Sequence, residues 1–284
     1  MAKQRKGSAA PVKARPAMGP WIVVACVVAV VAILVVVKLA EPSPAPTGPA
    51  RDGQAVSSRM LAALRVPPAV LAGVGKGGAA FPSGAGIRPQ AAALTSGGKP
   101  EMLYIGGDFC PYCAAERWAL VVALSRFGSF SSLRYMTSSA SDVYPSTPTF
   151  TFYKAAYSSP YLTFVGVETA GNRMVGGQYQ PLQSPTAGQQ ALLKKYDPNG
   201  SIPFLDLGGR FVQVGANYDP GVLKGLGWRQ IAAQAREGKG SVGQDILGSA
   251  NVLTAAICAT DGQRPAQVCK ASYVQNLEAA LPRG

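Results

Sequence analysis

A Cys-x-x-Cys motif between an apolar segment and a helical pattern constrains this chain more than any other feature. The stretch from Tyr104 to Trp118 reads YIGGDFCPYCAAERW. This order places Cys110 and Cys113 at the N-terminus of a helix, where unpaired amides and the helix dipole favour a thiolate. We therefore predict thiol–disulfide chemistry, with Cys110 as the nucleophile and Cys113 as the thiol that resolves the mixed disulfide.

The same motif has two other interpretations, namely half of a zinc site and a purely structural disulfide. A closed zinc site needs two more ligands, but the chain has no histidine, and Cys258 and Cys269 lack the spacing of a zinc knuckle. A disulfide between Cys110 and Cys113 would close a very short loop and add little stability. We therefore predict no metal and no cofactor. The lack of histidine also argues against Ser-His-Asp and Cys-His catalysis.

The N-terminal residues predict a membrane anchor. Residues 1–20 carry five basic side chains and no acidic one, and residues 21–37 form an uninterrupted apolar run. With Lys38 reaching the interface, the span is about the 20 residues that cross a bilayer. A basic head stays in the cytoplasm, so the rest of the chain is expected outside it, tethered to the cell membrane by a single pass. A cleaved signal peptide is the alternative, which the length of the run and the position of Lys38 disfavour.

The domain organisation follows from this anchor. The chain as a whole has a net charge of +13, but beyond the basic head the charges form no stripe interleaved with aromatic residues, so we expect no nucleic-acid binding. The expected parts are a cytoplasmic head at 1–20, a transmembrane helix at 21–40, a Pro-rich linker at 41–58 and an extracytoplasmic domain at 59–284, with its core at about 100–240 and a C-terminal helical part at 241–284.

Hydrophobic periodicity predicts a mixed α/β (α+β) domain. Residues 73–98 are rich in Gly, Ala and Pro and are expected to form loops and turns. The expected helices are 57–65, 113–127, 186–196, 228–236, 246–259 and 271–281. The expected strands are 102–105, 133–136, 149–153, 161–167, 202–207 and 210–214, the last two forming a hairpin.

This order of elements resembles the thioredoxin fold over roughly residues 100–240. In that superfamily a proline at the start of the hairpin strand follows a cis peptide bond and faces the active-site cysteines, and Ile202-Pro203 matches it by position. The resemblance implies a catalytic role for Pro203 and pairing of a peptide substrate with the backbone beside Ile202. A trans proline at a strand start is the alternative. Pro111 and Tyr112, between the cysteines, are also expected to contact substrate.

A closer similarity covers residues 99–128 and the tail that holds the last two cysteines. Both are similar to a poorly characterised prokaryotic family of membrane-anchored, extracytoplasmic thioredoxin-like proteins. The similarity implies a thioredoxin-like fold with extra strands and C-terminal helices after one N-terminal transmembrane helix. Tyr104 departs from cytoplasmic thioredoxins, which have a buried acid at that position. Asp108, two residues before the motif, either assists proton transfer or lies in a solvated turn, and we favour the second.

Cys258 and Cys269 are predicted to form a structural disulfide. Both lie beyond the predicted membrane segment, where disulfides persist. Cys258 ends an apolar helical stretch and Cys269 precedes the last helix, so a bond would join two helices across their connecting loop. A second redox pair is the alternative, and it is disfavoured because neither cysteine belongs to a Cys-x-x-Cys at a helix N-terminus.

Two functions are compatible with these patterns. The first is a membrane-tethered thiol–disulfide oxidoreductase of the DsbA or disulfide-isomerase type. It would act on exported proteins that carry cysteines or disulfides, and a membrane redox partner would reset its cysteine pair. The second is a redox-inactive binding or assembly protein on the same scaffold, because a fold does not fix a function.

Overall fold

The computed structural model describes residues 50–79, 88–89 and 93–282. The predicted head and transmembrane helix, and the first part of the predicted linker, lie outside the described residues. Residues Gly48–Gly284 form one structural unit, and the description that follows concerns this unit. It combines sheets and helices, which confirms the predicted α+β class.

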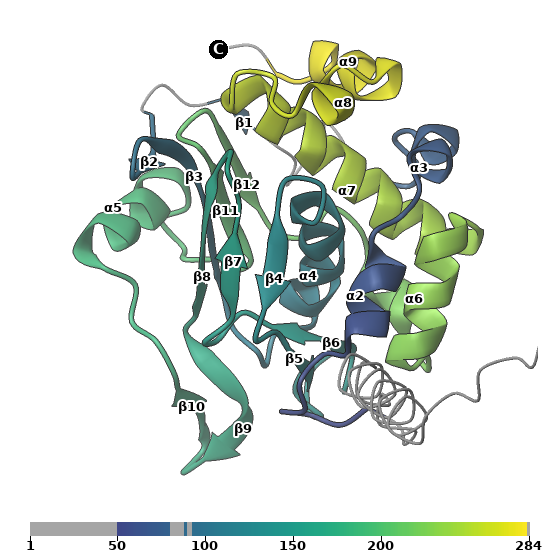
Figure 1. The fold of residues 1–284 in the computed structure, drawn as a ribbon. Coiled ribbons are helices and arrows are strands. Elements are labelled where there is room, and N and C mark those ends of the chain that lie inside the picture. The colour runs from purple at the N-terminus through teal and green to yellow at the C-terminus, as the bar shows by residue number, and fades with distance from the viewer. Residues whose placement is uncertain (1–49, 80–87, 90–92, 283–284) are drawn as a thin grey trace, which may run out of the picture. The chain divides into compact units, whose positions relative to one another are not determined.

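A six-stranded sheet forms the centre of the unit (Figure 1). Its central strand β3 (Lys99–Gly106) pairs antiparallel with β11 (Phe204–Leu207) and parallel with β8 (Thr163–Glu168). Beyond β11 the sheet continues through the hairpin partner β12. Strand β12 (Phe211–Val214) pairs in turn with β1 (Arg88–Pro89), and β2 (Thr95–Ser96) pairs with the N-terminal end of β3.

The two faces of β3 contribute to different hydrophobic clusters. Met102 and Tyr104 belong to the larger cluster, whereas Leu103 and Ile105 belong to a smaller one. This alternation follows from the two-residue period of a strand. The smaller cluster is covered by α5 (Ala187–Tyr196), whose apolar side chains pack against it. Because both faces are covered, β3 is buried from its middle to its C-terminal end, where the Cys-x-x-Cys motif follows.

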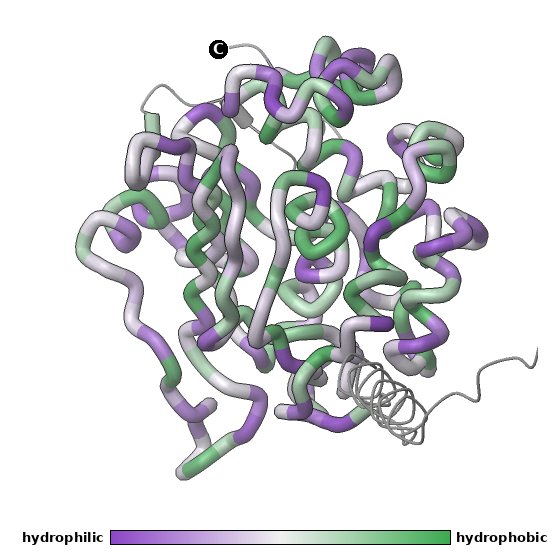
Figure 2. The backbone as a smooth tube through the Cα atoms, viewed as in Figure 1, coloured by the Kyte–Doolittle hydropathy of each residue, from purple (hydrophilic) through white to green (hydrophobic). Residues whose placement is uncertain are grey.

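Helices cover the other face of the sheet (Figure 1). The helix after the motif, α4 (Pro111–Leu124), packs against the long α7 (Gly240–Thr260). Figure 2 shows hydrophobic residues concentrated along the sheet strands and α4, and mixed hydropathy on the outer helices. These outer helices are α2 (Ser58–Leu64), α3 (Pro68–Val74), α6 (Trp228–Glu237), α8 (Ala266–Cys269) and α9 (Ser272–Ala279).

Helix α7 alone, among the helices of the described residues, is long and apolar enough to cross a membrane. It has 21 residues, and 83% of its apolar window is buried within the protein. It contacts α4, α6 and α9, so its apolar surface is already covered by other helices. Asn251 donates hydrogen bonds of 2.8 Å to the carbonyl oxygens of Leu71 and Gly75, which fixes α3 against this helix.

Three two-stranded sheets accompany the central sheet. The β9–β10 hairpin turns at Gly176 and Gly177, which both have positive φ, and it extends away from the main sheet (Figure 1). The three pairs are β4 (Ser129–Ser131) with β7 (Ala156–Ser158), β5 (Arg134–Thr137) with β6 (Pro148–Thr151), and β9 (Ala170–Val175) with β10 (Gln178–Pro181).

The structure corrects the predicted linker boundary at residue 58. The amide of Gly53 donates to the carbonyl of Tyr135 at 2.8 Å, and the amide of Val56 donates to the carbonyl of Leu133 at 2.9 Å. This segment therefore extends the β5–β6 pair and belongs to the domain. The sequence prediction also missed the β9–β10 hairpin, because that exposed ribbon has no alternating apolar pattern.

Candidate active site

Cys110 is the N-cap residue of α4. Its backbone is extended, with φ −79° and ψ 123°, and its sulfur accepts a hydrogen bond from the amide of Cys113 at 3.2 Å. Pro111 occupies the first helical turn, where a missing amide hydrogen costs nothing and the fixed φ suits the helix. Both cysteines are free thiols in the structure. The local sequence thus produces the predicted thiol at a helix N-terminus.

The two thiols differ in exposure and acidity. Cys110 is 6% exposed and Cys113 is fully buried. The pKa of Cys110 is lowered, chiefly by the hydrogen bond from the Cys113 thiol, with backbone amides and Arg117 adding to an effect that outweighs burial. Burial and the same hydrogen bond raise the pKa of Cys113 well above its ordinary value. The pair therefore consists of one slightly exposed thiol that favours the thiolate and one fully buried thiol that favours the proton.

The segment before β11 lies beside Cys110. The Cys110 sulfur is 3.9 Å from the carbonyl oxygen of Ile202, and the Ile202–Pro203 peptide bond is cis. Pro203 is buried, whereas Ile202 is partly exposed next to the thiol. The structure thus brings together residues 92 positions apart, as the resemblance to the thioredoxin superfamily implies.

The two residues between the cysteines have different surroundings. Pro111 is buried, whereas the Tyr112 side chain is 42% exposed. The Tyr112 ring makes an edge contact with the ring of Tyr144, with centroids 6.0 Å apart. Tyr112 therefore presents a partly exposed ring at the start of α4, close in sequence to Cys110.

A buried ion pair lies one helical turn below the motif. Arg117 donates from Nε and Nη2 to the two carboxylate oxygens of Glu168, both at 2.8 Å, and from Nη2 to the carbonyl of Gly107 at 2.7 Å. Both charged side chains have zero exposure. Glu168 ends β8, so the pair connects α4, the sheet and the turn before the motif. This pair was not predicted from the sequence, although a charged residue inside the apolar pattern of α4 is the signal that could have identified it.

Asp108 belongs to this buried cluster. It is 1% exposed, and one of its carboxylate oxygens lies 3.6 Å from Nη2 of Arg117. Burial, followed by the charge of Glu168, raises its pKa to about 7 against the opposing effect of Arg117. The expectation of a solvated turn is therefore wrong. The β9–β10 hairpin covers the turn: the Asp108 amide donates to Ala170 at 2.8 Å, and Phe109 stacks on Tyr179 with centroids 4.2 Å apart.

Tyr104 occupies the position where cytoplasmic thioredoxins carry a buried acid. It is fully buried, its ring lies 5.8 Å from the guanidinium carbon of Arg117, and burial raises its pKa well above the ordinary value. Gly106 is required beside it, because a Cβ there would stand 2.1 Å from the Tyr104 hydroxyl oxygen. In this protein Asp108 is a buried acid close to the motif, supplied by the turn rather than by the strand.

Cys258 and Cys269 are joined by a disulfide, the pairing that the sequence predicts. Their Cα atoms are 5.4 Å apart, and both residues are fully buried. The bond connects the end of α7 to α8. Among the residues that the structure describes, no group of three or more His, Cys, Asp or Glu side chains is placed to hold a metal ion.

Residues 87–196 match a family model described as a domain of unknown function (DUF929). The matched part contains both motif cysteines and the buried cluster of Asp108, Arg117 and Glu168, but it ends before Pro203. The chain matches no curated protein and no solved structure.

Proposed function

We propose that this chain is a membrane-tethered, extracytoplasmic thiol–disulfide oxidoreductase with a thioredoxin-like fold. The observation that carries the proposal is the asymmetry between Cys110 and Cys113 at the start of α4. A lowered pKa at the slightly exposed thiol and a raised pKa at the fully buried one suit attack on a disulfide followed by intramolecular resolution. A structural cysteine pair requires neither property.

The arrangement of elements supports a thioredoxin-like scaffold. Strand β3 leads into the cysteines and α4, its parallel neighbour is β8, and its antiparallel neighbour β11 begins directly after the cis-proline Pro203. The placement of Ile202 next to Cys110 suits a substrate peptide that pairs with this segment in an extended conformation. The membrane anchor in this proposal is the apolar run at residues 21–37.

The chemistry proceeds by two exchanges. The Cys110 thiolate attacks a substrate disulfide, forming a mixed disulfide and releasing one substrate sulfur as a thiolate that takes up a proton. Cys113 then loses its proton and attacks the Cys110 sulfur, which forms the Cys110–Cys113 disulfide and releases the second substrate thiol. The substrate is reduced by two electrons and the pair is oxidised by two. Run in reverse, the same steps oxidise substrate thiols. Arg117 favours the thiolate form of both cysteines.

Catalysis is tested with the full-length chain in an insulin-reduction assay with dithiothreitol as the electron donor. Wild-type protein should accelerate the reduction, and Cys110→Ser should abolish the acceleration. Cys26→Ser, which removes a thiol elsewhere in the chain, is the matched control and should retain activity. An unaccelerated reaction with the wild-type protein, or undiminished activity in Cys110→Ser, contradicts the proposal.

Substrate turnover is tested by trapping. Cys113→Ala removes the resolving thiol, so Cys110 should remain bonded to its partners. Non-reducing gels of cells that carry this variant should show adducts that disappear with reductant, and the Cys110→Ala/Cys113→Ala variant should show none.

The predicted location has its own test. Protease added to intact spheroplasts should digest the domain if it lies outside the cytoplasm. Protection of the domain until the membrane is lysed would contradict the proposed topology without bearing on the thiol chemistry.

A binding or assembly role is the second candidate. Met174 and Val175 favour it, because their side chains are 53% and 65% exposed near the tip of the β9–β10 hairpin. Val143, which precedes the Tyr144 that contacts Tyr112, is 71% exposed. An inactive wild-type protein in the insulin assay, together with an absence of adducts in the trapping experiment, would favour this role.

A further inference from the structure

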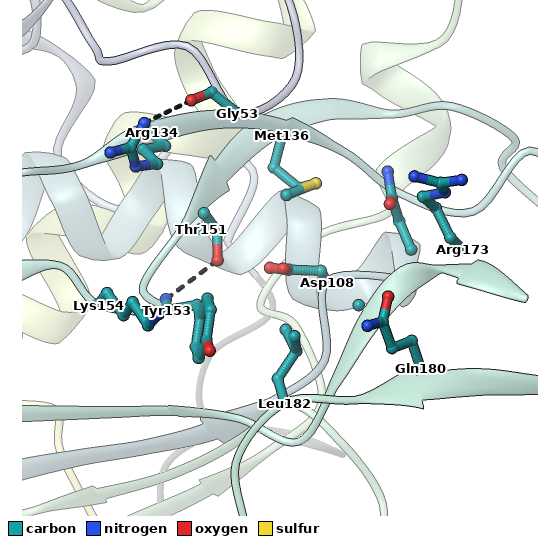
Figure 3. A pocket seen from close by; sticks show the side chains of 12 residues that line it. Gly53, Asp108, Arg134, Met136, Thr151, Tyr153, Lys154, Arg173, Gln180 and Leu182 are labelled. Carbon is teal, nitrogen blue, oxygen red and sulfur yellow. Dashed lines mark hydrogen bonds between the residues drawn. The ribbon is translucent and has the colours of Figure 1, made fainter. Parts of the chain in front are cut away.

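A cavity of ≈ 390 Å³ lies beside the turn that precedes the cysteines (Figure 3). Its walls come from the segment around Gly53, from β5 and β6, and from the β9–β10 hairpin and the residues just after it. Asp108 lines it from the turn before the motif. The cavity thus lies against the active-site turn, yet neither cysteine is among its lining residues.

Three cationic side chains line this cavity: Arg134, Lys154 and Arg173. Within the described ranges, no carboxylate lies within ion-pair distance of any of them. Arg134 donates to the carbonyl of Gly53 at 2.7 Å, and Lys154 lies over the ring of Tyr153. In Figure 3, Arg173 lies on one side of the cavity and Arg134 and Lys154 lie on the other. This distribution of positive charge favours an anion between them.

Asp108 provides a second observation that points to a ligand. Its side chain is almost completely buried, and its Oδ1 atom, which lies 3.6 Å from Nη2 of Arg117, has no hydrogen-bond partner. Figure 3 shows the carboxyl group pointing among the lining side chains of Met136, Thr151 and Leu182. Arg117 interacts with this oxygen by charge alone, and a buried polar atom without a hydrogen bond is costly. A ligand in the cavity would supply that hydrogen bond. A protonated Asp108 donates a hydrogen bond to an incoming anion.

The remaining walls set the character and charge of the ligand. Met136, Leu182 and the ring of Tyr153 provide apolar surface, which suits a carbon body rather than an inorganic ion. Two carboxylates limit the charge of the ligand: Glu168 lies behind Asp108, and Asp52 is close enough for both to raise the Asp108 pKa by repulsion. A monoanion is therefore favoured over a dianion.

We propose that this cavity binds the carboxylate of an organic acid, either a small free acid or the C-terminus of a peptide. Arg173 and Lys154 attract the carboxylate, Asp108 donates a hydrogen bond to it, and the apolar wall contacts its carbon chain. This binding is independent of thiol chemistry, so it stands or falls separately from the proposed oxidoreductase function.

Binding should depend on pH through Asp108. The groups that face this carboxyl are Arg117 from α4, Glu168 from β8, Thr151 from β6 and Asp52 from the N-terminal segment, besides the three cations of the cavity. Its pKa of about 7 means that the proton needed for donation is lost near neutrality. Binding should therefore be tighter at about pH 6 than at about pH 8.

The test is a titration of the full-length chain with butyrate, in which binding is measured by calorimetry and by amide chemical shifts. Saturable binding should shift the resonances of Gly171 and Tyr153, while neutral butyramide should have no effect. Arg173→Gln should weaken binding about tenfold, as expected for the loss of one charge-assisted hydrogen bond. Arg173 is exposed, so folding should be unaffected. Lys194→Gln, an exposed cation on α5, is the control and should bind normally.

Two further arms make the outcome decisive. Acetyl-Ala-Leu with a free C-terminal carboxylate, and the same peptide with an amidated C-terminus as its control, distinguish the two sources of the carboxylate. Binding of the peptide carboxylate but not of butyrate identifies a peptide C-terminus. Binding of butyrate but not of the peptide carboxylate identifies a small acid. Asp108→Asn, whose amide donates at every pH, should bind equally at about pH 6 and about pH 8. Equal binding of acid and amide, undiminished binding by Arg173→Gln, or no saturable binding of either carboxylate overturns the proposal.

Discussion

Arg117 and Glu168 form a bidentate ion pair that is completely buried below the Cys-x-x-Cys turn, with both N–O distances at 2.8 Å. The residues are 51 positions apart, one in α4 and one at the end of β8. The same guanidinium also donates to the carbonyl of Gly107 and lies 3.6 Å from Asp108. One side chain therefore connects the helix that carries the thiols to the sheet and to the preceding turn.

Replacing Arg117 should destabilise the protein strongly. In Arg117→Met, Glu168 is left as an unpaired buried carboxylate, and such losses cost about 3–5 kcal/mol. Urea unfolding followed by circular dichroism measures the change. The Arg117→Met/Glu168→Met variant should recover much of the stability, because it removes both charges. A double variant that is less stable than the single one would show that the pair itself is strongly favourable.

Arg117→Lys provides a milder variant with a prediction for the thiol. Lysine keeps the charge but lacks the planar fork that bonds both oxygens of Glu168. The protein should fold with reduced stability. The Cys110 pKa should remain below its ordinary value because the hydrogen bond from Cys113, its chief cause, is unchanged and a positive charge is still present. Thiolate absorbance near 240 nm during a pH titration reports that pKa. A Cys110 pKa at or above the ordinary value would indicate that the charge of Arg117 needs its fixed geometry to act.

Asp108 should make the folded state less stable as the pH rises. Its pKa is raised from 3.8 to about 7 by burial, so the folded protein holds a proton that the unfolded chain has lost between these values. Stability contributed by this proton is present at low pH and is lost as the pH approaches 7, by at most about 4 kcal/mol. Glu116, with a pKa also near 7, acts in the same direction.

The Asp108→Asn variant separates these two acids. Urea unfolding of both proteins at about pH 5 and about pH 8 should show a smaller loss of stability with rising pH for Asp108→Asn than for the wild type, because the variant lacks the Asp108 carboxyl. Some loss should remain in both proteins, because Glu116 titrates in both. An identical pH dependence of the two proteins would mean that Asp108 titrates in the folded state much as it does in the unfolded chain.

Cys110 should react with iodoacetamide before Cys113. The pKa of Cys110 is lowered, while Cys113 is fully buried with a raised pKa. Mass spectrometry after a short reaction of the reduced protein at about pH 6.5 should find the label on Cys110. In Cys110→Ser, labelling of Cys113 should be much slower. Equal labelling of both thiols would contradict the assigned roles of nucleophile and resolving thiol.

The parts of the site that the sequence predicts are those fixed by local order. A strand, a turn and Cys-Pro-Tyr-Cys before an apolar helix place Cys110 at a helix N-terminus regardless of the rest of the chain. The contact between Cys110 and Ile202 spans 92 positions and was reached through a family resemblance rather than from the local pattern. Short-range signals thus predict the chemistry of Cys110, whereas the position of Ile202 beside it is predicted by the family resemblance alone.

The parts that the sequence analysis missed depend on long-range burial. Arg117 and Glu168 are charged residues that are usually exposed, and only the packing of α4 on the sheet shows that they are paired. Asp108 is buried because the β9–β10 hairpin covers it, and the residues of that hairpin lack a strand-like apolar pattern. Because the sequence prediction missed this hairpin, it also placed Asp108, beside the Cys-x-x-Cys motif, in solvent.

The disulfide between Cys258 and Cys269 should stabilise the fold without taking part in exchange. Its cysteines are separated by 11 positions and are fully buried, one near the end of α7 and the other in α8. Closing a loop of this length contributes about 3 kcal/mol in the chain-entropy model. Cys258→Ser/Cys269→Ser should lower the melting temperature and keep the insulin-reduction activity at a temperature where the variant is folded.

Because serine also leaves buried hydroxyls, Cys258→Ala/Cys269→Ala serves as the matched variant, and it should lose stability by a similar amount. Loss of activity in a variant that retains its native circular dichroism spectrum would instead make this disulfide a redox partner of the Cys110–Cys113 pair.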